Sequence, residues 1–112
     1  MACLVSPVAQ FDVYQNPNVA QREVFPFLVQ IQSDQLSSFS TRLIMPLQRL
    51  KLAPGALPRR LSQTVLIQGE SLCLAAHFMA AIRTKMLGKP MADLAADRSL
   101  ILDAVDAVIS GV

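Results

Sequence analysis

The sequence predicts an α+β domain in which five or six closely spaced strands precede a single C-terminal helix. Three observations lead to this prediction. Short segments in the first two thirds of the chain alternate polar and apolar residues, which is typical of half-buried strands. Residues 97–112 instead follow the helical period of 3.6 residues. The chain has 112 residues and is 53% hydrophobic, which suffices for one core and leaves no room for a second domain.

Five strands are predicted between residues 10 and 76. They cover residues 10–14, 27–32, 41–47, 64–67 and 71–76, each bounded by turn-forming residues. In the second of these, the alternation puts Phe27, Val29 and Ile31 on one face. The third is a nearly continuous run of β-type residues, which favours a central strand, with Pro46 marking its end or a bulge.

The segment at residues 79–87 is compatible with a strand or a helix, because Met, Ala, Lys and Leu are also good helix formers. We predict a strand, because turns flank the segment and the last helix needs a sheet to pack on. Residues 91–94 are predicted to form a short turn. Residues 53–60 form a Pro-rich and Gly-containing loop, in which Arg59 and Arg60 are expected to be solvated.

The terminal helix has chemically marked ends and two distinct sides. Asp97 is predicted to cap its N-terminus, and Gly111 stands where a left-handed residue would end it. At 100° per residue, one narrow polar stripe separates from a very wide apolar arc. The stripe consists of Ser99, Asp103, Asp106 and Ser110.

The apolar arc of this helix is wider than one sheet can cover, and the chain as a whole is apolar for a monomer, with a mean hydropathy of +0.42. We therefore predict a homodimer. Its interface is expected to include the helix flank that bears Leu100, Ala104 and Val108.

Charge is distributed unevenly along the chain. Eight of the ten basic residues lie between Arg42 and Lys89, where Glu70 is the only acid, whereas residues 93–112 carry four Asp and one Arg. This pattern has two interpretations. It can serve solubility alone, or the basic body can attract an acidic partner while the acidic helix contacts a protein rather than phosphate.

The sequence contains no strong signal for catalysis, and no catalytic residue, metal site or cofactor is predicted. His77 is the only histidine, and a lone histidine beside an apolar run favours a structural role. Acid–base cleavage of RNA could be assembled only from Arg42, Glu70 and His77. The glycines are isolated, so no phosphate-binding loop is present. No aromatic residue neighbours Arg59 and Arg60, so sequence-specific nucleic-acid binding is not expected.

The remaining features concern location and cysteine chemistry. Cys3 and Cys73 lack the spacing of a disulfide framework or a metal site, so both are interpreted as apolar residues. Residues 1–9 are interpreted as a loose leader, and residues 10–112 as the single domain. The longest apolar run falls short of a membrane span. We expect a cytoplasmic protein that does not enter the membrane.

Several short motifs occur in an order that resembles the CcdB toxin family. They are Gln10-Phe11-Asp12-Val13-Tyr14, Gln32-Ser33-Asp34, Arg42-Leu43-Ile44-Met45-Pro46-Leu47, Gly69-Glu70-Ser71, Ala92-Asp93-Leu94 and a terminal glycine–apolar pair. The resemblance covers about residues 10 to 112. It implies an SH3-like antiparallel β-barrel or sheet, a small second sheet, one C-terminal helix and a dimer.

The resemblance also implies a function. Members of this family are toxins of type II toxin–antitoxin systems that bind the A subunit of DNA gyrase and trap the gyrase–DNA cleavage complex, without acting as enzymes. A cognate CcdA-like antitoxin neutralises them. Carried onto this sequence, the gyrase-binding residues are Ser99, Asp103, Asp106, Ile109, Ser110, Gly111 and Val112.

Two departures from the family pattern leave alternatives open. Ser110 stands where the plasmid-borne member has Trp, and Ser99, Asp103 and Asp106 stand where it has Asn. A serine buries far less apolar area than an aromatic ring. One alternative is therefore a degenerate or solitary homologue that binds an antitoxin without poisoning gyrase. The other is an endoribonuclease on the related fold that uses Arg42, Glu70 and His77.

Overall fold

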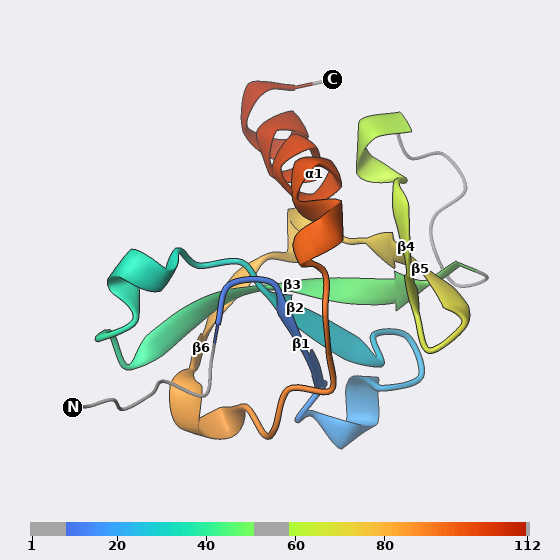
Figure 1. Cartoon of the computed structure of the whole chain (residues 1–112). Helices are drawn as coiled ribbons and strands as arrows, with labels where there is room; N and C mark the ends of the chain where they lie inside the picture. The colour runs from blue at the N-terminus through green and yellow to red at the C-terminus, as the bar shows by residue number, and fades with distance from the viewer. Residues whose placement is uncertain (1–8, 51–58, 112) are drawn as a thin grey trace.

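Seven antiparallel strands and one α-helix make up the part of the chain that the structure describes (Figure 1). The computed structural model describes residues 9–50 and 59–111. The strands are β1 (Asp12–Gln15), β2 (Phe27–Gln30), β3 (Thr41–Arg49), β4 (Thr64–Ile67), β5 (Glu70–Leu74), β6 (Ala80–Arg83) and β7 (Ala92–Asp93). The helix α1 (Arg98–Ser110) follows them. This arrangement confirms the predicted α+β class and the SH3-like layout, a nearly closed antiparallel sheet with one terminal helix.

Short 3-10 turns connect these elements. They are η1 (Val19–Gln21), η2 (Asp34–Leu36), η4 (Arg59–Leu61), η5 (Ala76–Phe78), η6 (Thr84–Met86) and η7 (Ala95–Asp97). Two segments of the chain differ from their prediction. Residues 79–87 form a strand only at β6 and continue as η6, and the predicted turn at residues 91–94 contains β7, which pairs with β1.

The nine-residue strand β3 organises the sheet, because it pairs with β2 along one edge and with two strands along the other. Its first half pairs with β6, and its last three residues pair with β5. Pro46 lies at the change of partner, and its carbonyl accepts the Ala75 N–H at 3.0 Å. The strand therefore neither ends nor bulges there. It joins the β4–β5 hairpin to the rest of the sheet, so the expected small second sheet is not separate within the described residues.

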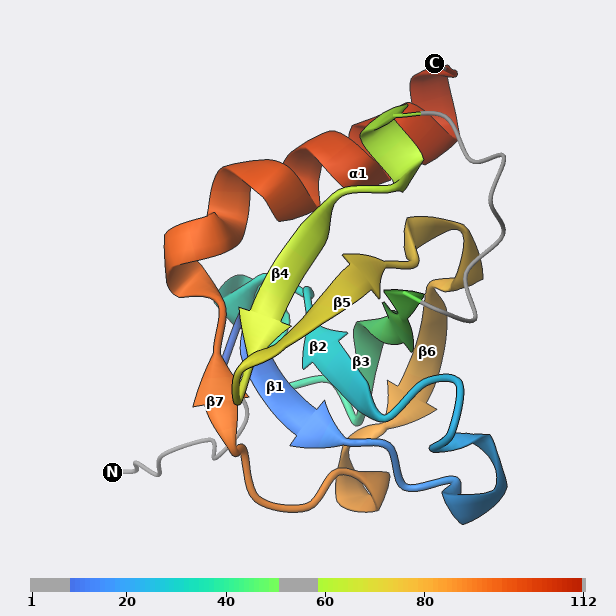
Figure 2. The ribbon, with the colours of Figure 1, turned by 90° about the vertical axis from the view of Figure 1, so that its right-hand side faces the viewer.

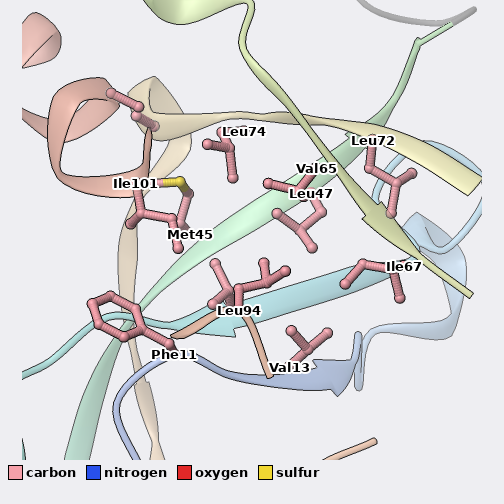
Figure 3. Close-up of a cluster of buried hydrophobic side chains, with 13 residues drawn as sticks. Phe11, Val13, Met45, Leu47, Val65, Ile67, Leu72, Leu74, Leu94 and Ile101 are labelled. Atoms are coloured by element: carbon pink, nitrogen blue, oxygen red, sulfur yellow. The ribbon is translucent and has the colours of Figure 1, made fainter. Parts of the chain in front are cut away.

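The sheet has one face in the main core and a second face with a smaller apolar cluster. The main core contains Val13, Val29, Met45, Leu47, Val65, Ile67, Leu72, Leu74 and Ile101, among others (Figure 3). Phe27 and Ile31 pack against it beside Val29, as the alternation predicted. Alternate residues of the same strands, such as Leu28 and Ile44, form the second cluster with Tyr14 and Leu87.

The helix α1 lies across the main core and beside η4 (Figure 2). Its residues Ile101, Ala104 and Ala107 are buried. Its C-terminal end is as predicted, because Gly111 adopts φ 86° and its N–H donates to the Ala107 carbonyl at 3.1 Å. Asp97 occupies the predicted N-cap position, but its side chain does not make the expected capping hydrogen bond, and η7 leads directly into α1.

Some predicted features lie outside the described residues. These include residues 1–8 of the expected leader, residues 53–58 of the expected loop, Cys3 and Val112. Ala9 is described, and its N–H donates to an Asp12 carboxylate oxygen at 3.1 Å. Cys73 is a buried core residue, as expected. No helix in the described part of the chain is long and apolar enough to cross a membrane.

Candidate partner-binding surface on the terminal helix

The polar stripe predicted for the last helix lies on the side of α1 that faces away from the sheet. Ser99, Asp106 and Ser110 are exposed, and Asp103 is half-buried. At 100° per residue, the buried residues Ile101, Ala104 and Ala107 lie about 80–200° from Ser99 around the helix axis. They therefore occupy a different side of the helix from the stripe. The stripe is therefore available to a partner, apart from the contacts that the chain itself makes with it.

One arginine from η4 covers the middle of this stripe. The Nη2 atom of Arg60 donates to Asp106 Oδ2 at 2.7 Å and to Asp103 Oδ1 at 2.9 Å. Its Nε atom donates to the same Asp103 oxygen at 3.2 Å. The expectation that Arg60 is a solvated loop residue is therefore wrong. An arginine fork matches carboxylate geometry well, and here it joins the basic body to the acidic helix.

Two further side chains extend this network. Gln63 donates from Nε2 to Asp103 Oδ2 at 2.7 Å, so both oxygens of Asp103 have a donor. Ser110 donates from Oγ to the Asp106 carbonyl at 2.8 Å and lies 3.3 Å from Asp106 Oδ2. We call Arg60, Gln63, Asp103, Asp106 and Ser110 the Arg60 network. Sequence reasoning missed Arg60 and Gln63, because they lie about 40 residues before their partners.

The network changes the acidity of both aspartates. Hydrogen bonds from Arg60, and then from Gln63, lower the pKa of Asp103 below its usual value. The hydrogen bond from Arg60 is also the main cause of the lowered pKa of Asp106, with a smaller contribution from Ser110. Both carboxylates are thus held in the ionised form that pairs with the guanidinium.

Apolar residues on α1 divide between core and surface differently from the prediction. Ala104 is fully buried and Leu100 packs against the core, while Val108 at the end of the helix is 38% exposed. Leu100 and Ala104 of the flank predicted for a dimer interface thus pack into the chain's own core, and Val108 is its exposed residue. The exposed apolar flank instead carries Leu102 and Ile109, which are 44% and 78% exposed and lie two helical turns apart.

One known protein family matches most of the chain. The model of the family described as CcdB protein matches residues 10–111 of the chain. This match spans both the sheet and the terminal helix. The chain belongs to the CcdB family. It is therefore a toxin of a toxin–antitoxin module, and toxins of this family act by binding other proteins.

The three residues considered for RNA cleavage do not form a site in this CcdB-family toxin. Arg42 is only 2% exposed and donates to the carbonyl oxygens of Ser37, Phe39 and Thr41, so it holds the segment before β3 in place. Glu70 lies instead near Arg49, at 3.5 Å. Arg42 and Arg49 are seven residues apart on β3, or roughly 20 Å along an extended strand.

The surroundings of His77 also differ from those of a catalytic histidine. It is exposed in η5, and its ring lies against the ring of Phe78 with centroids 4.3 Å apart. No cluster of three or more potential metal ligands occurs among the residues that the structure describes. The geometry therefore gives an RNA-cleaving mechanism no support.

Several residues of the basic body predicted from the sequence are engaged in contacts within the toxin itself. Arg42 is buried, Arg49 is near Glu70, and Arg60 is in the network on α1. Lys51 lies outside the described residues. The remaining four basic side chains of this stretch are exposed: Arg59, Arg83, Lys85 and Lys89. Arg83 lies on β6, Lys85 lies on η6, and Lys89 follows shortly after η6.

An apolar groove of about 590 Å³ lies on the sheet face opposite the main core, and none of these four basic residues lines it. Its lining includes Leu28, Ile44, Phe78, Ile82 and Met86. Lys89 lines a neighbouring hollow that shares Met86 with the groove. Arg83 and Lys85 line a different hollow. The toxin thus has a second exposed region, an apolar groove with basic residues on the adjoining β6 and η6, that is distinct from the stripe on α1.

Proposed function

We propose that this CcdB-family toxin binds the A subunit of DNA gyrase through α1 and the C-terminal tail, and traps the gyrase–DNA cleavage complex. The carrying observation is that polar and apolar binding groups share one exposed side of the helix. Asp106 lies on this side, next to Leu102 and Ile109. The tail continues from Gly111 at the end of the same helix. A surface of this mixed character fits a protein partner better than a nucleic acid.

The expected contact residues are the stripe and the tail. They are Ser99, Asp103, Asp106, Ile109, Ser110, Gly111 and Val112. Asp103 contributes least through its own oxygens, because Arg60 and Gln63 already occupy them. Asp106, Ile109 and Gly111 contribute most, because they are exposed.

A degenerate homologue that binds an antitoxin without poisoning gyrase is the second candidate. The observation that favours it is the orientation of Ser110, whose hydroxyl donates back to the Asp106 carbonyl. This side chain therefore offers a partner little apolar area at the position where the family has an aromatic residue.

Growth assays separate these candidates. The chain is expressed in a gyrase-sensitive bacterium and in an isogenic strain whose gyrase A subunit resists such toxins. Arrest in the sensitive strain alone supports gyrase poisoning, and arrest in neither strain supports the degenerate homologue. Arrest in both strains would contradict both candidates and indicate another target.

Deletion of Val112 tests the tail within the same assay. We expect this deletion to abolish growth arrest and weaken binding to gyrase A while changing the free energy of unfolding by at most about 0.5 kcal/mol, as for other peripheral changes. Val19→Ala is the matched control, because Val19 is 70% exposed on η1, far from α1 (Figure 1). If toxicity and gyrase affinity survive the deletion, the tail only ends the helix.

The antitoxin is proposed to bind the apolar groove together with the exposed basic residues on β6, on η6 and after it. An acidic antitoxin segment with apolar anchors would complement both the floor of the groove and the exposed charges of Arg83, Lys85 and Lys89. This location leaves α1 free for gyrase. The toxin is also proposed to act as a cytoplasmic homodimer, with Val108, the exposed residue of the predicted flank, at the interface.

A further inference from the structure

We infer that Arg60 is a positioning residue of the gyrase-binding surface, which turns two free carboxylates into a paired, hydrogen-bonding stripe and holds the start of the tail. This inference rests on the proposed binding of gyrase through α1. It assigns a role to a residue of η4 that lies outside the helix and 43 residues before Asp103.

The first part of the argument concerns charge. Asp103 and Asp106 are three residues apart, so they lie on the same side of α1 and would repel each other if both were free. Arg60 Nη2 lies within 2.9 Å of both carboxylates. One cation between two anions leaves the cluster with a single negative charge instead of two. The stripe then presents to a partner polar groups that are already paired with one another.

The second part concerns the tail. Arg60 donates from Nη2 to the Asp103 carbonyl at 3.3 Å and from Nη1 to the Gly111 carbonyl at 3.5 Å. Ser110 is held from the other side by its hydrogen bond to Asp106. One guanidinium therefore contacts both the middle of α1 and the residue that ends it. Its loss would free the carbonyl from which the tail continues.

The third part concerns what the network leaves for a partner. Within the described chain, Asp106 Oδ1 has no hydrogen-bond donor, and Arg60 Nη1 has only the long contact with Gly111. The side chains of Asp106 and Arg60 are 63% and 32% exposed. The network thus offers one acceptor and one donor side by side. The matching partner surface is polar and carries both a donor and an acceptor, rather than a run of basic residues.

The adjacent Arg59 provides a matched control. It belongs to the same turn, carries the same charge and is exposed. Among the described residues its side chain contacts no carboxylate, whereas that of Arg60 contacts two. Replacing either arginine by alanine changes the net charge of the toxin equally. A difference between the two variants therefore reports on the network and not on long-range electrostatics.

The experiment measures the affinity of the full-length toxin for purified gyrase A subunit by titration calorimetry. The variants are Arg60→Ala, Arg59→Ala and the triple variant Arg60→Ala with Asp103→Asn and Asp106→Asn. We expect Arg60→Ala to weaken binding about tenfold. Arg59→Ala should stay within about twofold of wild type, and the triple variant should recover most of the loss, because amides need no cation.

Thermal unfolding of each variant excludes a trivial explanation. Exposed ion pairs contribute little to stability, so all three variants should melt close to wild type and differ only in gyrase affinity. A triple variant as weak as Arg60→Ala would overturn the charge argument. Equal affinities of Arg60→Ala and Arg59→Ala would overturn the inference while leaving the proposed function intact. A wild-type toxin that does not bind gyrase A would overturn both.

Discussion

Ile101 is the largest fully buried side chain of α1, so the packing of the helix on the sheet depends most on this residue. It is fully buried and faces Met45 and Leu94 in the main core (Figure 3). Ile101→Ala removes three carbon atoms, which corresponds to roughly 2.4 kcal/mol at about 0.8 kcal/mol per buried methylene. The cavity adds to this figure, so we expect a loss of about 3 kcal/mol in the free energy of unfolding. At ~4 °C per kcal/mol for a domain of this size, the melting temperature should fall by about 12 °C.

Circular dichroism during heating and urea titration measures this loss, with two graded controls. Ile101→Val removes a single carbon and should cost about 1 kcal/mol. Leu66→Ala removes three carbons at a position that is 65% exposed on β4 and should cost at most about 0.5 kcal/mol. Ile101→Asp should not fold, because it buries an unpaired charge. The assignment of the core-facing side of α1 is wrong if Ile101→Ala melts within about 3 °C of wild type.

Three further predictions concern assembly, electrostatics and alkaline stability. Sedimentation at micromolar concentration should give a dimer that Val108→Asp dissociates and the control Val19→Asp does not; a wild-type monomer would refute it. Association with the antitoxin should slow as salt rises, because the charges of Lys85 and Lys89 are exposed and screened; an on-rate independent of salt removes electrostatic steering. Burial is the main cause that raises the pKa of Tyr14 from 10.0 to about 12, so the unfolded chain loses this proton first and stability should fall as pH rises between these values. Tyr14→Phe should lack this fall, and an unchanged pH profile would contradict it.

Local sequence was sufficient for features that neighbouring residues decide. Alternation located β2 and its core-facing Phe27 and Val29, because side chains on a strand point to opposite faces in turn. Gly111 marked the end of α1, because few other residues adopt a positive φ without strain. The helical period separated the polar stripe from the apolar arc, and the order of short motifs identified the family.

The tertiary structure decided which part of the apolar arc faces the sheet. Hydrophobicity alone would bury Leu102 and Ile109 before Ala104 and Ala107, yet the two alanines are buried and the larger side chains are exposed. The arc is wider than the contact, so periodicity leaves the rotation of the helix undetermined. Small side chains on the inner side allow the helix to approach the sheet closely, and close packing of the core then fixes the rotation.

The tertiary structure also decided the character of the candidate binding surface. The sequence presents Asp103 and Asp106 as an acidic stripe and Arg60 as part of a solvated loop. No local pattern joins them, because only the folded sheet brings η4 beside α1. Ion pairs act over a few ångströms in space and carry no periodic signature along the chain. The chemistry of this surface therefore depends on a contact that exists only after folding.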